Sequence, residues 1–231
     1  MKILHPSFEI LYMPSYEEAI KLIELAGRTC YKSEHLICDG SAEKFIKKIV
    51  DFGHESVIEH SLITVKFICD RGVSHELVRH RLASYSQEST RYANYSKERF
   101  GSEISVIKPP FWEEDSVQYK IWYKAMKECE KAYLSLIKAG ASPQEARSVL
   151  PNSLKTEIVM SCNFREWRHV LKLRCSKRAH PQIRELMLAL LKVFYHRFPV
   201  IFHDIYQLYE DSLKEIPDYL ASIIKKYTQK P

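Results

Sequence analysis

Glycine is scarce in this sequence, and the spacing of its glycines excludes the common glycine-rich nucleotide loops. The six glycines among 231 residues lie far apart along the chain. Neither a Gly-x-Gly-x-x-Gly loop nor a Gly-Lys-Ser/Thr loop is present, so a Rossmann dinucleotide loop and a P-loop are both excluded. Any nucleotide phosphates must therefore be held by side chains and by helix ends.

Clustered cysteines are also lacking. No two cysteines form a Cys-x-x-Cys pair, and none stands at zinc-finger spacing from a second pair of ligands. The six cysteines are Cys30, Cys38, Cys69, Cys129, Cys162 and Cys175. Such scattered thiols indicate reduced cysteines, so we expect a cytoplasmic protein.

Long apolar runs are missing as well. The longest apolar run near the C-terminal end, Leu186–Leu191, is far shorter than a membrane span. Met1–Leu4 is too short for the apolar segment of a signal peptide, and His5 and Pro6 interrupt it. We therefore expect a soluble, intracellular protein with no membrane partner.

The composition is that of an ordinary globular protein with a modest positive charge. Hydrophobic residues make up 45% of the chain, and 35 basic against 29 acidic residues give a formal net charge of +6. The positive balance favours anionic ligands such as phosphates and nucleotides. No linker rich in glycine, serine or proline divides the chain, so residues 1–231 are expected to form a single domain.

Local patterns predict many helices and few strands. Strands are predicted at 61–69, 103–108 and 154–162, and helices at 15–27, 41–52, 73–84, 112–139, 142–150, 165–174 and 181–197, with another toward the C-terminal end. The spacing of Ser15 and Glu18 is that of a capping box, and Gly27 can close the helix that follows. Because the strands and helices do not alternate regularly, the pattern indicates an α+β fold.

The helix predicted at 112–139 is amphipathic. Its apolar stripe is expected to comprise Val117, Ile121, Met126, Cys129, Tyr133, Leu136 and Ile137.

A segment with two histidines invites a metal-site interpretation. His54-Glu55-Ser56-Val57-Ile58-Glu59-His60 lacks the second histidine that a zincin motif needs, and His54 and His60 do not share a helical face. The other interpretations of this segment are a polar turn that leads into the following strand and a contact with a ligand. We expect no metal there.

The segment from Arg79 to Tyr92 has the highest density of side chains that could bind a ligand. Three arginines and a histidine stand among hydroxyl and amide side chains, and guanidinium groups match phosphate oxygens bidentately. Composition alone leaves three interpretations open: a solvated basic helix end, an anion-binding site, or an RNA-binding loop.

The order of several motifs resembles the flavin-dependent thymidylate synthase family. Arg79-His80-Arg81, seven residues and then Ser89 is similar to that family's Arg-His-Arg-x7-Ser signature, and Thr90-Arg91-Tyr92 continues it. Similar blocks are Arg28-Thr29-Cys30-Tyr31, Gly53-His54-Glu55-Ser56, Ala146-Arg147-Ser148-Val149-Leu150-Pro151, Asn163-Phe164-Arg165 and Leu173-Arg174. The resemblance covers residues 28 to 185, which is most of the chain.

The resemblance implies an activity, a fold and an assembly. In the family, NADPH reduces FAD, methylenetetrahydrofolate supplies a one-carbon unit, and dUMP is converted to dTMP. Its members are similar in having an α+β fold with a central, mainly antiparallel sheet. They form homotetramers whose active sites are shared between subunits.

The resemblance also implies roles for individual residues. The implied flavin contacts are Ser56, Glu59, Arg79, His80, Arg81, Asn163, Arg165 and His169. The implied dUMP contacts are Glu76, Arg79, Gln87, Ser89, Arg91, Arg147 and Arg174, with Arg147 coming from another subunit. Three of these positions depart from residues that members of the family carry there, namely Glu76, Gln87 and His169.

Arg174 matches the arginine that activates the pyrimidine. Uracil C5 is a poor nucleophile, and a permanent positive charge beside N3 and O4 stabilises the negative charge that makes the ring enolate-like. No enzyme nucleophile is then needed, so we expect none of the six cysteines to be catalytic.

Two alternatives from other classes stay open. An RNA-binding module would bind RNA in a salt-dependent way and carry no flavin. An RNA uracil methylase would carry flavin but ignore dUMP.

Overall fold

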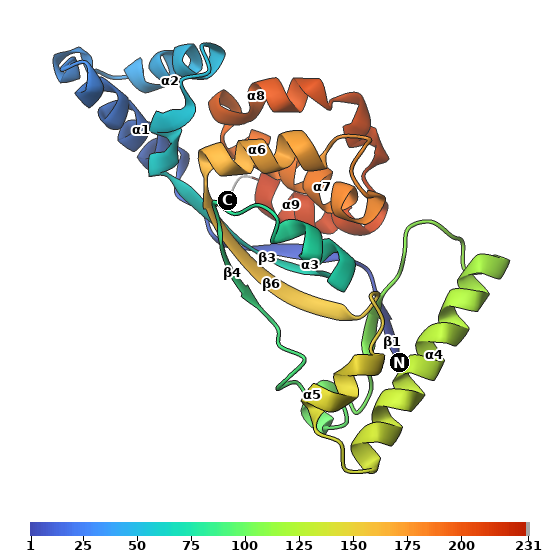
Figure 1. Ribbon diagram of the computed structural model, residues 1–231. Helices are drawn as coiled ribbons and strands as arrows, with labels where there is room; N and C mark the ends of the chain where they lie inside the picture. Colours follow the sequence, from blue (N-terminus) through green and yellow to red (C-terminus); the bar gives the residue numbers. More distant parts are fainter. Residues whose placement is uncertain (230–231) are drawn as a thin grey trace. The chain divides into compact units, whose positions relative to one another are not determined.

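The computed structural model describes residues 1–229, apart from the side chain of Phe100. Four strands form an antiparallel sheet in the order β2 (Ser7–Tyr12), β3 (Leu62–Asp70), β6 (Lys155–Asn163) and β4 (Ser84–Gln87). Helices flank this sheet (Figure 1). The predicted α+β fold with its mainly antiparallel sheet is therefore confirmed.

Both central strands have alternating burial, which was predicted for β3. In β3, Ile63, Val65, Phe67 and Cys69 are buried, while the side chains between them are only partly buried. In β6 the even-numbered positions from Thr156 to Cys162 are buried in the same way. One face of each strand therefore contributes to the core, as the period of two requires.

The chain divides into two compact units, each built from three separate segments. Unit 1 comprises residues 1–7, 67–79 and 85–159, and unit 2 comprises residues 8–66, 80–84 and 160–231. One boundary lies between Arg79 and His80, and the others fall within β2, β3, β4 and β6, so these four strands continue from one unit into the other. The expectation of a single domain stays a prediction.

Unit 2 contains most of the helices. They are α1 (Tyr16–Cys30), α2 (Ser41–Asp51), α6 (Phe164–Arg174), α7 (Pro181–Arg197), α8 (Pro199–Leu208) and α9 (Ala221–Thr228), with short 3-10 helices η1 (Glu34–Leu36), η2 (Glu55–His60), η5 (Asp211–Glu215) and η6 (Asp218–Leu220). α7 is buried along almost its whole length and packs against α6, α8 and α9 (Figure 1). Ring contacts such as Trp167 with Phe194 and Phe164 with Phe198 fill the space between these helices.

The start of α1 is confirmed, but its predicted end is wrong. Ser15 and Glu18 form the capping box at the first turn. The helix then continues past the buried Gly27 to Cys30. A Cβ atom at Gly27 would lie 2.5 Å from Cε1 of Phe45 on α2, so this glycine is needed for close helix packing. The sequence predicts a helix end at Gly27 because glycine is common just after a helix, whereas packing against another helix is not visible in a local sequence pattern.

Unit 1 has its own core. Its elements are β1 (Lys2–Leu4), β5 (Ser105–Ile107), α3 (Arg71–Leu77), η3 (Glu98–Phe100), α4 (Val117–Lys138), α5 (Pro143–Ala146) and η4 (Arg147–Val149). β1 and β5 pair in parallel, and Ile104 and Val106 are buried with residues of α4. The short strand β1 and the strand β2 were not predicted.

The long helix α4 differs from its prediction in two ways. It begins after Ser116, whose side chain caps Tyr119, rather than at Trp112. Its buried face comprises Tyr119, Trp122, Met126, Glu130 and Tyr133. Val117 and Ile121 of the predicted stripe are exposed, because the buried positions follow a register through Tyr119 and Trp122 instead.

The helix predicted at 73–84 is wrong in its second half. α3 ends at Leu77, where the Tyr85 hydroxyl donates a hydrogen bond of 2.6 Å to the Leu77 carbonyl. Ser84–Gln87 is strand β4. The side chains of 79–81 are two arginines and a histidine and offer no apolar face, so this segment does not stabilise a continuation of the helix.

Within residues 1–229, no helix combines the length and the apolar character that crossing a bilayer requires.

Candidate functional site

Arg174 and His80 form the centre of the candidate site in unit 2. Arg174 is the last residue of α6, and its Nε–H donates a hydrogen bond of 2.9 Å to Nε2 of His80. The two residues are 94 positions apart in the sequence. The fold therefore joins the Arg-His-Arg segment to the C-terminal end of α6.

His80 is held in its neutral form. Its side chain is only 4% exposed, and burial, together with the positive charge of Arg174 and the neighbouring His169, lowers its pKa to about 4. Because Nε2 accepts a hydrogen bond from Arg174, the neutral ring must carry its proton on Nδ1. Glu166 lies 3.8 Å from Nδ1, and burial raises the pKa of its carboxyl group. A neutral imidazole can accept from the guanidinium without repelling it.

The first turn of α6 presents two more predicted flavin contacts. Asn163 caps the helix, and its side chain accepts from the Glu166 N–H at 2.9 Å. Arg165 is exposed and bonds to Glu59 of η2 at 2.5 Å. His169 lies one turn further along α6, with its ring centroid 5.8 Å from that of His80. Side chains of α6 therefore contact Glu59 of η2 and His80 of the Arg-His-Arg segment.

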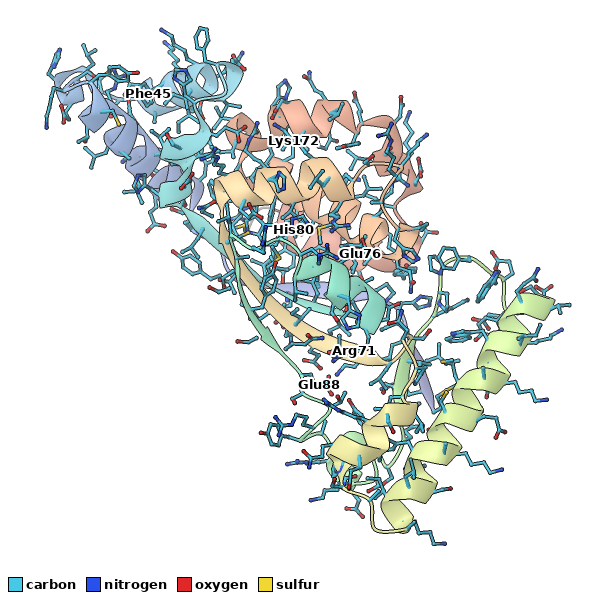
Figure 2. The ribbon with its side chains drawn as sticks, viewed as in Figure 1. Phe45, Arg71, Glu76, His80, Glu88 and Lys172 are labelled. Carbon is cyan, nitrogen blue, oxygen red and sulfur yellow. The ribbon has the colours of Figure 1, made fainter. Side chains whose placement is uncertain are left out.

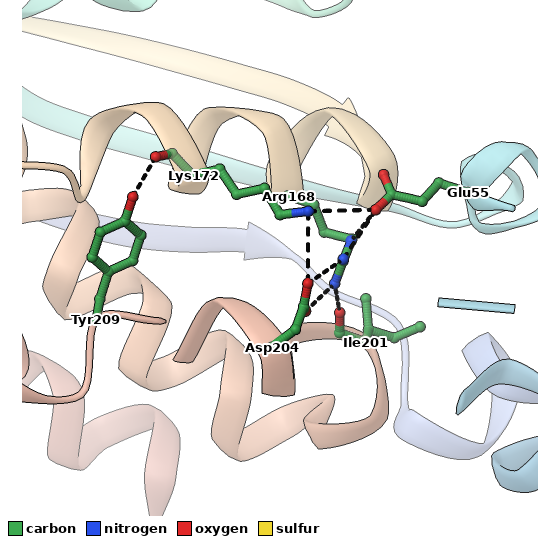
Figure 3. A network of polar contacts seen from close by, with 6 residues as sticks. All are labelled: Glu55, Arg168, Lys172, Ile201, Asp204 and Tyr209. Atoms are coloured by element: carbon green, nitrogen blue, oxygen red, sulfur yellow. Dashed lines mark hydrogen bonds and ion pairs between the residues drawn. The ribbon is translucent and has the colours of Figure 1, made fainter. Parts of the chain in front are cut away.

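A buried arginine ties η2 to the helices behind it. Arg168 is 1% exposed and bonds to both carboxylate oxygens of Asp204 on α8, to Glu55 of η2 and to the Ile201 carbonyl (Figure 3). Lys172 lies 3.6 Å from both Glu55 and Asp204. Burial opposes ionisation of Asp204, but the hydrogen bonds and charge of Arg168 outweigh it and lower the pKa of this carboxyl group. The network fixes the turn that carries Ser56 and Glu59.

A cavity of about 990 Å³ opens between α1, α2 and η2. Its lining includes the predicted flavin contacts Ser56 and Arg165. Phe45 of α2 also lines the cavity (Figure 2). The guanidinium of Arg28 lies 4.7 Å from the centroid of the Phe45 ring. The volume is that of an ordinary small-molecule site.

Unit 1 carries a polar cluster formed by Lys155 and Glu157 of β6 and by Glu88, which directly follows β4. Lys155 bonds to Glu88 at 3.1 Å and to Glu157 at 2.6 Å. Burial disfavours its charge, but these two carboxylates outweigh burial and raise the pKa of Lys155. Arg71 and Glu88 belong to the same region (Figure 2), and Arg71 donates to the Glu88 carbonyl at 3.5 Å.

The predicted nucleotide contact Gln87 is held firmly within unit 1. Its amide nitrogen donates to the Ser74 hydroxyl at 2.9 Å and to the Thr156 hydroxyl at 3.2 Å. Its amide oxygen is oriented by these two bonds. In the following loop, the Arg91 N–H donates to the Ser89 hydroxyl at 3.3 Å, and the Arg91 side chain is exposed.

The predicted site residues are thus distributed over both units. Unit 2 holds Ser56, Glu59, His80, Arg81, Asn163, Arg165, His169 and Arg174. Unit 1 holds Glu76, Arg79, Gln87, Ser89, Arg91 and Arg147. Within unit 1, Arg147 lies in η4 with an exposed side chain, and Ser89 and Arg91 share one loop. The roles of all these residues stay predictions.

Sequence reasoning missed the residues that support the site. Glu166, Arg168 and Asp204 were not singled out, although Glu166 and Arg168 are buried charges on the helix that carries Arg174. Charged side chains at core-facing positions of an otherwise amphipathic helix are the signal that could have found them. No group of three or more His, Cys, Asp or Glu side chains in residues 1–229 could hold a metal ion.

In this α+β fold Arg174 and the neutral His80 meet at the C-terminal end of α6. Comparison with known proteins identifies the family to which this arrangement belongs. The model of the Thy1 family, described as thymidylate synthase complementing protein, matches residues 12–200. The chain therefore belongs to the flavin-dependent thymidylate synthase family of enzymes, which confirms the resemblance found in the sequence.

Individual relatives agree with this membership. The flavin-dependent thymidylate synthase of Geobacter sulfurreducens is 35% identical over 189 residues, which cover 79% of this chain and 80% of that protein. That of Pyrococcus furiosus is 36% identical over 172 residues, covering 74% of this chain and 70% of that protein.

A solved structure shares the fold. The crystal structure of the UMP/dUMP methylase PolB from Streptomyces cacaoi, bound with 5-Br dUMP, matches with a TM-score of 0.73. The match covers 90% of this chain and 97% of that chain at 21% sequence identity. At this identity the likeness concerns the fold alone.

Proposed function

We propose that this protein is a flavin-dependent thymidylate synthase that methylates dUMP to dTMP, with methylenetetrahydrofolate as carbon donor and NADPH as reductant through FAD. The observation that carries the proposal is the hydrogen bond between Arg174 and His80. It unites two motifs of the family in one site, and family membership over residues 12–200 supports it.

Arg174 is proposed as the catalytic residue. The hydrogen bond to His80 uses its Nε–H, which fixes the plane of the guanidinium without removing its charge. A guanidinium held beside N3 and O4 of uracil stabilises the negative charge that develops as C5 attacks the one-carbon unit. His80 acts on Arg174 through orientation, because a neutral imidazole adds no charge of its own.

The chemistry of the proposed flavin contacts fits a flavin. Ser56 and Arg165 line the cavity, and Glu59 holds Arg165 in place. The proposed flavin contacts are these residues with Arg79, His80, Arg81, Asn163 and His169. The donor set suits FAD because it combines cations for the pyrophosphate with neutral donors and acceptors for the ring. Bound FAD would supply the reducing equivalents that NADPH delivers.

For the nucleotide we propose Glu76, Arg79, Gln87, Ser89, Arg91 and Arg147, together with Arg174. The exposed guanidinium groups of Arg91 and Arg147 suit a phosphate. The oriented amide of Gln87 suits a polar edge of the nucleotide. We propose that Arg147 serves a neighbouring subunit, in a homotetramer whose active sites are shared.

No enzyme cysteine is proposed as a nucleophile. Burial raises the pKa of Cys69, Cys162 and Cys175, so their reactive thiolate forms are scarce near neutral pH. Negative charge on the pyrimidine is instead stabilised by Arg174. We further propose a cytoplasmic protein whose substrate is a mononucleotide, with no nucleic-acid or membrane partner.

Substrate choice tests this proposal against an RNA uracil methylase. The flavin-loaded protein is given methylenetetrahydrofolate and NADPH with dUMP, with UMP or with a uracil-containing RNA. We expect methylated product from dUMP and none from the RNA. Methylation of the RNA without any dTMP would overturn the proposal, and a protein that binds RNA but purifies without flavin would favour the RNA-binding module.

A further inference from the structure

The cavity of unit 2 extends well beyond the two proposed flavin contacts. Ser56 and Arg165 come from η2 and α6, whereas most of the other lining residues belong to α1, to α2 or to the residues that directly follow these two helices. The side chains from α1 and α2 belong to none of the motifs assigned above to the flavin or to dUMP. Whatever ligand occupies that part lies next to the proposed flavin site.

Two of the cations that line the cavity, both lysines of α2, have no carboxylate partner within the described part of the chain. Arg28 is neutralised by Glu24, which is 2% exposed and bonds to it at 2.9 Å, and Arg165 is neutralised by Glu59. Lys44 and Lys48 line the same cavity, and neither forms an ion pair within the described part of the chain. Two like charges at positions i and i+4 of a helix destabilise it, so their placement suits an anionic ligand.

Aromatic rings accompany these lysines. Tyr31 is 78% exposed and Phe52 is 67% exposed, and both line the cavity together with Phe45. Exposed rings of this size gathered at a cavity mark a binding surface, and they suit an aromatic group that stacks on them. The cavity therefore favours a ligand that joins an aromatic ring to a row of anionic groups.

We propose that this cavity binds the p-aminobenzoyl and poly-γ-glutamyl part of the folate, with Lys44 and Lys48 pairing with successive glutamyl carboxylates. The proposal rests on the proposed function, since it names how the carbon donor is held beside the flavin. Lys44 and Lys48 stand one helical turn apart, about 6 Å along the axis, which presents a row of cations to a row of carboxylates. A dinucleotide would instead bring its charges in a compact pyrophosphate.

The first test is a binding measurement that needs no turnover. p-Aminobenzoyl-pentaglutamate is titrated by calorimetry into the flavin-loaded protein and into the variant K44Q/K48Q. The matched control is K47Q, because Lys47 is an exposed neighbour on α2 that does not line the cavity. We expect the double variant to bind roughly threefold to tenfold more weakly and K47Q to bind like the parent protein. Equal binding by all three proteins would overturn the proposal.

The second test compares methylenetetrahydrofolate carrying one glutamate with that carrying five. We expect the parent enzyme to have the lower KM for the pentaglutamate, and K44Q/K48Q to lose most of this preference while its flavin content stays unchanged. A double variant that loses flavin, or whose KM rises for NADPH alone, assigns the lysines to another ligand and overturns the proposal. If the parent protein makes no dTMP from either folate, the proposed function fails, and the calorimetric titration still decides whether the cavity binds the tail.

Discussion

At the scale of single residues, the account depends on the different charge states of Arg174 and His80. The guanidinium is permanently charged, whereas burial keeps the imidazole neutral with a pKa of about 4. The hydrogen bond of 2.9 Å between them therefore orients a cation without weakening it. This combination suits a residue that must stabilise developing negative charge on a bound ring.

Arg174→Lys keeps a positive charge but removes the planar fork that His80 orients. We expect kcat to fall by roughly 10²- to 10³-fold, because the charge no longer faces the developing enolate in a fixed geometry. Flavin content should fall far less than turnover. Steady-state kinetics and the flavin-to-protein absorbance ratio check this, with Arg178→Lys, an exposed arginine in the turn after α6, as control. Unchanged turnover in Arg174→Lys would refute the assignment.

The neutral state of His80 predicts a pH dependence of stability. Its pKa in the folded protein is about 4, below the unfolded value of about 6.5, so the unfolded chain binds a proton that the folded chain does not. The contribution of His80 is fully present above pH 6.5 and is lost as the pH falls toward 4.

His80→Gln retains an acceptor for Arg174 but does not titrate. Between about pH 6.5 and pH 4, we expect the free energy of unfolding of the parent protein to fall more steeply than that of the variant. The difference in slope should approach one proton, about 1.4 kcal/mol per pH unit. Urea unfolding of both proteins across this range measures it. Identical slopes would show that His80 does not titrate on unfolding.

The sequence allowed the site residues to be proposed only through the family resemblance. The Arg-His-Arg segment and Arg174 are visible as motifs, but a separation of 94 residues hides their hydrogen bond. For 79–92, composition alone left three interpretations open, namely a solvated basic helix end, an anion-binding site and an RNA-binding loop. Burial decides the charge state of His80, and burial is a property of the fold.

At the scale of elements, the position of η2 is set by the polar network behind it. Arg168 is nearly fully buried and bonds to Glu55 of η2 and Asp204 of α8 (Figure 3). A buried cation needs such partners, because an unpaired charge in the core is strongly destabilising. The same bonds hold the turn that bears the proposed flavin contacts Ser56 and Glu59.

Arg168→Met should release η2 as well as destabilise the protein. Removing the cation leaves the Glu55 and Asp204 carboxylates without their main partner, and we expect a loss of about 3–5 kcal/mol in the free energy of unfolding. The affinity for FAD should also fall in folded samples, as measured by fluorescence titration. Lys172→Met, at an exposed position of the same network, is the control and should lose at most about 1 kcal/mol. Unaltered FAD affinity in Arg168→Met would contradict the positioning role.

Element boundaries could be predicted where the signal is local. Ser15 with Glu18 forms the predicted capping box, and Ser142 with Glu145 forms another at the start of α5. Gly27 misled the prediction because its role is to admit the Phe45 ring from another helix. The strand Ser84–Gln87 was missed because its hydroxyl side chains carry no alternating apolar pattern.

At the scale of the whole molecule, the chain forms two compact units whose segments alternate along the sequence. Each unit is assembled from three segments, and β2, β3, β4 and β6 run from one into the other. Neither unit is therefore a single continuous stretch of chain. We therefore propose that the units unfold together as one domain.

The three tryptophans can test this cooperativity. Trp112 and Trp122 lie in unit 1, and Trp167 lies in unit 2. The variant Trp167→Phe reports on unit 1, because both of its remaining tryptophans lie there. Its urea unfolding is recorded on flavin-free protein at fixed concentration, once by fluorescence and once by far-ultraviolet circular dichroism. We expect the two unfolding curves to coincide. The variant Trp112→Phe/Trp122→Phe, which reports unit 2, should show the same coincidence. Two separate transitions would assign the units to independent domains.

The chain belongs to the flavin-dependent thymidylate synthase family and has an α+β fold. The central claim that an experiment must test is the reaction itself. The most direct measurement incubates the purified protein with FAD, NADPH, methylenetetrahydrofolate and dUMP and separates the products by chromatography, beside a control that omits only FAD. We predict dTMP in the complete mixture and little or none in the control. Folded, flavin-bound protein that makes no dTMP would contradict the account and would point to the departures at Glu76, Gln87 and His169 as marks of another substrate.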